Sequence, residues 1–197
     1  MTTSLIRWIQ KVSNLKEQCD IATIEGGEVN ISIPEVEINA MEQMLPITPS
    51  EIMAAYIGFV RAFHLWMHAA HNVTKGPGFA GDHASLYGPI YLEVQDVIDR
   101  IIEKGIGVFD DEELGCPMRI TSDAMLVLGG WESPVGQNGC RIADIALEYC
   151  RQLVTMDENV AATLEEMGAL TFGLENLLAE LADTHEGYVY LLQQRSK

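Results

Sequence analysis

The sequence predicts an all-α protein, a bundle of four long helices with one long connection between the second and third. Apolar residues recur at helical spacing over four separate stretches, and the segment between the second and third stretches is rich in glycine and proline. With 197 residues, 48% of them hydrophobic and 21% charged, the chain suits one well-filled domain.

An N-terminal arm over residues 1–46 is expected to precede the bundle of residues 47–197. Residues 3–19 have apolar side chains at helical spacing, which predicts a short amphipathic helix. This helix either docks on a subunit or serves as a weakly basic arm, since it carries Arg7, Lys11 and Lys16. The alternation over residues 29–33 indicates an edge strand within an extended segment.

The first bundle helix is expected to begin after Thr48 and to run to about Asn72. Thr48 can cap the helix, Pro49 suits the first helical position, and Glu51 can complete a capping box. The Gly-Pro-Gly sequence at residues 76–78 then ends the helix in a tight connection.

The second helix is predicted by an apolar stripe over residues 90–102, and we expect Gly105 and Gly107 to close it. The stripe consists of Ile90, Tyr91, Val94, Val97, Ile98, Ile101 and Ile102. Residues 107–140 form the long connection, in which residues 121–128 are the only expected helix.

Two further apolar stripes predict the third and fourth helices. The third stripe comprises Ile142, Ile145, Tyr149, Leu153, Met156, Val160, Leu164 and Met167. The fourth comprises Leu174, Leu178, Leu181, His185, Tyr188 and Leu192. Four long helices with one long middle crossover form the arrangement of ferritin-like four-helix bundles.

The charge balance argues against a nucleic-acid partner. Lys and Arg number 12 against 29 Asp and Glu, a formal net charge of −17, which repels phosphate backbones and attracts cations. The sequence shows neither a secretory leader nor an apolar stretch that could cross a bilayer, so we expect a cytoplasmic protein without a membrane partner. The four cysteines lack zinc-ribbon or disulfide-dense spacing, as suits a reducing compartment.

A histidine cluster is the main chemical signal. Four of the five histidines fall within twenty residues, namely His64, His68, His71 and His83. The first three share one helix face, as metal-ligand pairs on helices require. Taken singly, His64 and His68 are more simply explained as hydrogen-bonded core residues. His71 and His83 are better metal-ligand candidates because of the residues that surround them.

The second helix adds three carboxylates, Asp96, Asp99 and Glu103, near one face. Imidazole with carboxylate suits Fe(II) and, less selectively, Zn(II) or Mn(II). Solvation, or pairing with Arg100 and Lys104, explains these carboxylates without a metal. The chain has no Glu-x-x-His pair of the kind that di-iron bundles build, so iron is not expected inside the core of one subunit. The common zincin, hydrolase and phosphate-loop motifs are absent as well.

The segment from His71 to His83 resembles the signature of the Dps family of miniferritins. In that family a histidine, a Lys-Gly-Pro-x-Phe run and a second histidine twelve residues after the first contribute to an iron-oxidation site. Residues 71–83 match this spacing. By the same resemblance, Asp99 and Glu103 match an Asp and a Glu that face the partner subunit.

The resemblance implies a homo-oligomeric shell of twelve subunits, with iron sites shared across twofold interfaces. His71, His83, Asp99 and Glu103 would then be both the metal ligands and the catalytic groups of a ferroxidase-type oxidoreductase. Peroxide or dioxygen would oxidise Fe(II), and the hollow shell would store the ferric product.

Several positions depart from the family pattern. Asn72 replaces a usual tryptophan, and Tyr87 stands where an acidic ligand is usual. Tyr87 could act as a poor ligand, trap radicals or simply pack, and Asp82 or Asp96 could replace the missing carboxylate. One extra residue separates His83 from the carboxylates, and we expect a kink or bulge near Gly88-Pro89. The alternative function is a shell-forming structural or DNA- or partner-binding Dps-like protein with reduced or no ferroxidase activity.

Overall fold

The computed structural model of the chain describes residues 24–25, 28–29 and 47–197. The amphipathic helix expected over residues 3–19 lies outside the described residues. Two short antiparallel strands are described before the bundle, β1 (Ile24–Glu25) and β2 (Glu28–Val29). Of the edge strand expected over residues 29–33, only Val29 is described, and it lies in β2.

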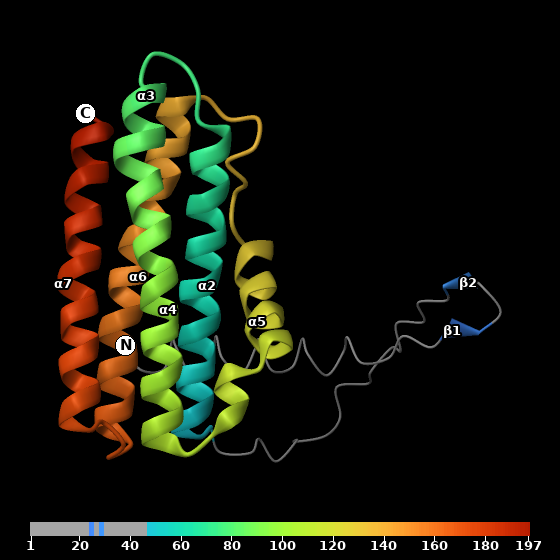
Figure 1. The fold of residues 1–197 in the computed structure, drawn as a ribbon, viewed down its shortest axis with the longest axis vertical. Helices are drawn as coiled ribbons and strands as arrows, with labels where there is room; N and C mark the ends of the chain where they lie inside the picture. The colour runs from blue at the N-terminus through green and yellow to red at the C-terminus, as the bar shows by residue number, and fades with distance from the viewer. Residues whose placement is uncertain (1–23, 26–27, 30–46) are drawn as a thin grey trace, which may run out of the picture.

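The predicted fold class is confirmed. Four long helices run side by side as an all-α bundle: α2 (Pro49–Val73), α4 (Gly88–Phe109), α6 (Gly139–Glu166) and α7 (Phe172–Arg195) (Figure 1). The crossover between α4 and α6 contains the 3₁₀ turn η2 (Glu112–Gly115) and the helix α5 (Pro117–Gly129), which lies against the outside of α2 (Figure 1).

The helices begin where the sequence provides caps. At α2, the Glu51 backbone N–H donates to Thr48 Oγ1 at 3.2 Å, and the Thr48 N–H donates to Glu51 Oε2 at 2.6 Å, which completes the predicted capping box. Asn138 and Thr171 cap α6 and α7 in the same way through side-chain oxygens. These caps satisfy backbone donors that would otherwise lack a partner in the first turn.

The end predicted for the second helix is wrong. Helix α4 continues through Gly105 and Gly107 to Phe109 and ends at Asp110, whose left-handed backbone (φ 53°) closes the last turn. Gly105 serves packing instead, because a Cβ built there would lie 2.9 Å from the Leu114 side chain of η2. The small residue therefore lets the crossover approach α4 closely.

A wide helical turn precedes α4. After the short helix α3 (Phe79–Gly81), the chain forms the π-helix η1 (Asp82–Tyr87), and the Gly88 N–H donates to the His83 carbonyl five residues earlier. This confirms the bulge expected next to Gly88-Pro89. A π-turn holds one more residue than an α-turn, so it accommodates the extra residue between His83 and the carboxylates of α4.

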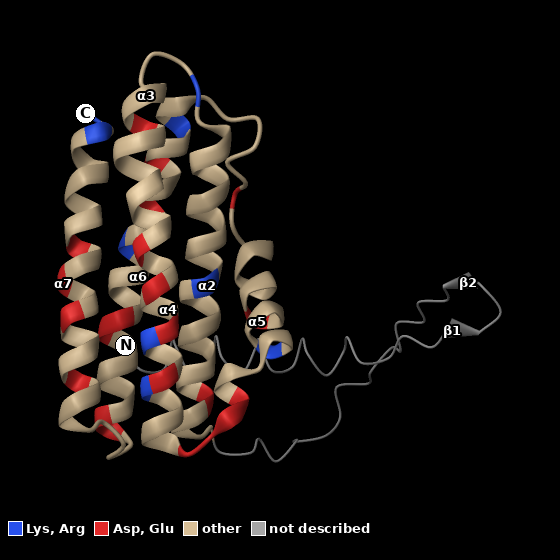
Figure 2. Ribbon diagram, viewed as in Figure 1, with Lys and Arg blue, Asp and Glu red and all other residues tan. Residues whose placement is uncertain are grey.

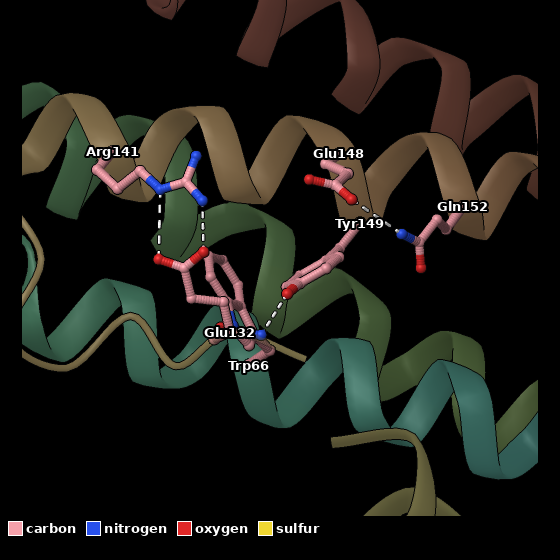
Figure 3. Close-up of polar contacts among 6 residues, drawn as sticks. All are labelled: Trp66, Glu132, Arg141, Glu148, Tyr149 and Gln152. Carbon is pink, nitrogen blue, oxygen red and sulfur yellow. Dashed lines mark hydrogen bonds and ion pairs between the residues drawn. The ribbon is translucent and has the colours of Figure 1, made fainter. Parts of the chain in front are cut away.

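An aromatic cluster anchors the crossover at Glu132 (Figure 3). Trp66 Nε1 donates to the Glu132 carbonyl at 2.8 Å, and the Glu132 N–H donates to the Tyr149 hydroxyl at 2.5 Å. Trp131 stacks on Tyr149 with ring centroids 4.2 Å apart, and Arg141 forms an ion pair with the Glu132 carboxylate. The connection is thus fastened to α2 and α6 through backbone groups.

None of the described helices combines the length and apolar character that a bilayer crossing requires. Three cysteines, Cys116, Cys140 and Cys150, are described as free thiols.

Candidate metal site

The two histidines that flank the loop between α2 and η1 hold each other in place. The His71 ring Nδ1–H donates to the His83 carbonyl at 2.9 Å, and the His83 ring Nδ1–H donates to the His71 carbonyl at 2.9 Å. Their rings stack with centroids 3.8 Å apart. This reciprocal pair joins the end of α2 to the π-turn η1.

The pairing fixes the chemistry of the rings. A carbonyl oxygen only accepts, so Nδ1 of each ring must carry the proton, and in the neutral tautomer the lone pair lies on Nε2. A metal-bound histidine is oriented in the same way, with its second ring nitrogen donating to a carbonyl or carboxylate. Both rings are only partly buried, so each Nε2 is a suitable donor to a metal ion.

Close packing in the π-turn depends on Gly88. A Cβ built at Gly88 would lie 2.8 Å from the His83 carbonyl oxygen and 3.4 Å from His71 Nδ1. A larger residue would therefore displace the carbonyl that receives the His71 proton. Glycine is required here by contact with the histidine pair.

Further aromatic rings extend the histidine pair along α2. Tyr91 of α4 stacks on exposed His68 with centroids 4.7 Å apart and lies 5.1 Å from His71. His64 is 6% exposed, and burial first, then Arg61 and His68, lower its pKa to about 4. His64 is therefore neutral at physiological pH, and its Nε2 is buried without a hydrogen-bond partner among the described residues. His68 presents its ring to solvent beside His71.

Asp82, one of the two substitutes expected for the missing acidic ligand, pairs with Arg195, and Tyr87, which stands at the acidic position, is buried. Asp82 is 2% exposed and accepts two hydrogen bonds from Arg195, at 2.6 and 2.9 Å. Tyr87 is fully buried, and burial raises the pKa of its phenol well above 10. A phenol that stays protonated is a weak metal ligand, which favours the packing interpretation of Tyr87.

The carboxylates of α4 point to solvent. Asp96, Asp99 and Glu103 are all exposed, and Figure 2 shows acidic residues along α4 and α7. Neither Asp99 nor Glu103 forms an ion pair with another described residue, and Arg100 pairs instead with Glu180 of α7 at 2.8 Å. Glu103 lines a groove of about 560 Å³ between α4 and α7. The structure therefore shows these carboxylates as exposed side chains and does not show the pairing with Arg100 that was considered for them.

Within one subunit the predicted ligands stay apart. Among the residues that the structure describes, no group of three or more His, Cys, Asp or Glu side chains could hold a metal ion. The histidine pair lies at the α2–η1 end, whereas Asp99 and Glu103 lie further along α4. Any site containing both would have to be built from two copies of the chain.

Sequence reasoning missed a buried polar network in the bundle core. The Tyr56 hydroxyl donates to Asp157 Oδ1 at 2.6 Å, and His185 Nδ1 lies 2.6 Å from Asp157 Oδ2. His185 is fully buried and Asp157 is 1% exposed. One signal was available, because Asp157 follows Met156 and precedes Val160 within an apolar helical stripe.

Comparison with known proteins identifies the fold. Dps from Vibrio cholerae O1 matches with a TM-score of 0.63 at 18% identity, over 76% of this chain and 89% of that protein, and is described as a member of a broad superfamily of ferritin-like diiron-carboxylate proteins. Dps from Mycobacterium smegmatis matches at 0.62 and 16% identity, over 75% of this chain and 84% of that protein. Dps from Staphylococcus aureus matches at 0.62 and 12% identity, over 76% and 95%.

No protein-family model and no curated protein matches the sequence. The structural matches to Dps proteins confirm the resemblance carried by residues 71–83 at the level of the fold. The bundle described above is the fold of Dps proteins.

Proposed function

We propose that this chain is a divergent miniferritin subunit that oxidises Fe(II) at sites shared between two copies and stores the ferric product in a hollow homo-oligomer, in the family pattern a dodecamer. The observation that supports this proposal is the reciprocal His71–His83 pair, which leaves both Nε2 atoms free for a metal. Asp99 and Glu103 of a second copy would complete the ligand set.

The residues fit Fe(II) as a substrate. Two imidazole nitrogens and two carboxylates are donors that Fe(II) accepts, and Zn(II) or Mn(II) could take the same ligands. With peroxide, two Fe(II) ions each lose one electron while the O–O bond breaks, and two protons complete two water molecules. Because the imidazoles must be neutral, iron binding should weaken as the pH falls below the range in which histidine protonates.

The first test is Fe(II) oxidation by peroxide, followed by absorbance, in the wild type, His83→Ala and Glu103→Ala. Replacing exposed Glu158 of α6 by alanine provides a matched control for the loss of a surface carboxylate. Fast oxidation in the wild type and the control, lost in both site variants, would support the site. A wild type no faster than buffer would rule out a ferroxidase.

A mixing experiment tests whether the site is shared. In an oligomer assembled from equal amounts of His83→Ala and Glu103→Ala subunits, each mixed pair retains one intact site, so about a quarter of all sites should be active. Recovery near this fraction supports ligands from two copies. No recovery would place all the ligands within one subunit.

The second candidate is a shell or partner-binding protein with little ferroxidase activity. The burial of Tyr87 and the engagement of Asp82 by Arg195 favour it, because neither residue is available as a third ligand beside His83. DNA as the partner is disfavoured by the net charge of −17. Mobility shifts at low and moderate salt would detect DNA binding, which should fall steeply with salt if phosphates drive it.

A further inference from the structure

A second cluster of reactive groups lies where the π-turn, the start of α6 and the end of α7 meet. Arg195, the last residue of α7, forks onto Asp82 through its Nε and Nη2 atoms. The same guanidinium lies beside the start of α6, because its Nη2 atom is 3.6 Å from a Cβ built at Gly139, the residue before Cys140. Cys140 is exposed and stands in the first turn of the 28-residue helix α6.

Two glycines give this cluster its shape. A Cβ built at Gly78 would lie 2.8 Å from Arg195 Nη2, and one built at Gly139 would lie 2.7 Å from the Lys75 carbonyl oxygen. The same Cβ at Gly139 would lie 3.6 Å from Arg195 Nη2. The guanidinium is therefore enclosed by backbone on two sides and keeps its position beside the start of α6.

An unused hydroxyl completes the cluster. The Tyr87 hydroxyl is buried and has no hydrogen-bond partner among the described residues, and its charged or ionisable neighbours are Asp82, Arg195, Asp144 and Cys140. Burying a hydroxyl without a hydrogen-bond partner makes the free energy of folding less favourable, so its presence calls for an explanation. Because burial raises the pKa of this phenol, it remains a hydrogen-bond donor at physiological pH.

We propose that Cys140 is a peroxide-reactive thiol, with Arg195 and the Tyr87 hydroxyl as the groups that bind the peroxide and the oxidised sulfur. Reactive cysteines are typically exposed, close to arginine and at the start of a helix. A guanidinium and a hydroxyl can both donate to peroxide oxygens. The proposal goes beyond Fe(II) oxidation and does not depend on it.

The reaction is a two-electron oxidation of sulfur. The thiolate attacks one oxygen of hydrogen peroxide, the S–O bond forms as the O–O bond breaks, and the leaving hydroxide takes a proton to become water. The thiol proton balances this proton, so a thiol and peroxide give a sulfenic acid and water. A sulfenic acid is reduced by other thiols, so the modification is reversible.

The two other cysteines that the structure describes provide internal controls. Cys116 stands at the N-cap position of α5, makes no side-chain capping hydrogen bond and is half-buried. Cys150 is buried, and burial raises the pKa of its thiol to about 12, so it should remain unreactive. Each thiol can be followed in the unmodified protein by peptide mass spectrometry.

The experiment treats the full-length, iron-free protein with hydrogen peroxide and traps sulfenic acid with dimedone. Labelling of Cys140 should be at least about tenfold faster than labelling of Cys116. Equal rates at the two cysteines would overturn the proposal. Because the protein is iron-free and a metal chelator is added, the result of this test is independent of the iron-oxidation experiment.

Two variants test the surrounding groups. Tyr87→Phe removes only a hydroxyl that has no partner, so a purely structural tyrosine predicts an unchanged rate at Cys140. We expect the rate to fall severalfold instead, and to fall further in Arg195→Lys, which keeps the charge but loses the fork. Circular dichroism would verify that both variants are folded. Unchanged labelling in both folded variants would overturn the roles assigned to Tyr87 and Arg195.

Discussion

Two histidine environments in this chain differ in the group that holds Nδ1. At the rim of the bundle, His71 and His83 donate to neutral backbone carbonyls, and their Nε2 atoms remain available. In the core, His185 contacts the Asp157 carboxylate, and its Nε2 is buried without a partner among the described residues. The same side chain thus leaves its Nε2 available at the bundle rim in one place and takes part in a buried hydrogen-bond network in the other.

The difference also shows where metal chemistry is possible. Di-iron carboxylate bundles place glutamates and Glu-x-x-His pairs in the core between the helices. Here the core positions carry Tyr56, Asp157 and His185, which satisfy much of one another's hydrogen bonding. We infer that chemistry in this chain belongs to the outer faces of α2, η1 and α4.

The largest effect should come from removing a rim histidine. His83→Ala should slow Fe(II) oxidation about 100-fold, because a lost ligand or its orienting partner typically costs that much. The stability of the fold should change little, since the ring is only partly buried. Oxidation kinetics and urea unfolding of the same preparation measure the rate and the free energy of unfolding separately. A loss of unfolding free energy equal to that of a core variant would contradict the distinction between the rim and core histidines.

A core variant should show the reverse behaviour. Asp157→Ala leaves Tyr56 and His185 without their partner, and breaking a buried network in this way costs about 3–5 kcal/mol of unfolding free energy. Tyr56→Phe removes one hydrogen bond and should cost only about 1 kcal/mol. Urea titration measures both. Near-equal losses in the two variants would mean that the carboxylate is not the centre of the network.

His64, which is buried on α2, should make the free energy of unfolding depend on pH. Its pKa is lowered from 6.5 to about 4 in the folded protein, so the unfolded chain takes up the proton first as the pH falls. The stabilisation is therefore present above pH 6.5 and is lost as the pH falls towards 4, by on the order of 3 kcal/mol. Unfolding of His64→Gln across this window should show a flatter pH dependence than the wild type.

The smallest effects concern the glycines of α4, the helix that carries Asp99 and Glu103. Gly105→Ala would bring a Cβ to 2.9 Å from Leu114 and should cost about 1 kcal/mol or more. At Gly107 a Cβ meets nothing within 4 Å, so Gly107→Ala should stabilise the helix by about 0.5–1 kcal/mol. Changes in melting temperature of opposite sign for the two variants would support an α4 that is continuous through both residues. Equal decreases would indicate that the helix ends at Gly105.

Local signals in the sequence predicted most of the helices. The capping box at Thr48 and the apolar stripes identified α2, α6 and α7 to within a few residues, because caps and periodicity act over short separations. The end of α4 was wrong because Gly105 meets Leu114 of the following turn, a contact that helix propensity does not encode.

The candidate site was only partly accessible to the same reasoning. The family resemblance over residues 71–83 pointed to a pair of histidines. The two reciprocal hydrogen bonds from each Nδ1–H to the other residue's carbonyl form only when the π-turn is folded. The partners of Asp82 and Asp157 lie 113 and 28 residues away in the chain, so no local pattern could predict them.

The π-turn at Asp82–Tyr87 has a further consequence, for insertions and deletions. In a regular α-helix each added residue rotates everything that follows by about 100° about the axis and advances it by about 1.5 Å. A π-turn takes up one residue as a wider ring, so the rotational phase of α4 relative to α2 is largely kept. Deleting exposed Ser85 should therefore convert the segment to a plain α-helix while α4 keeps the same face towards the core. Chain length at this point can vary by one residue without turning the carboxylates of α4 away from their outward direction.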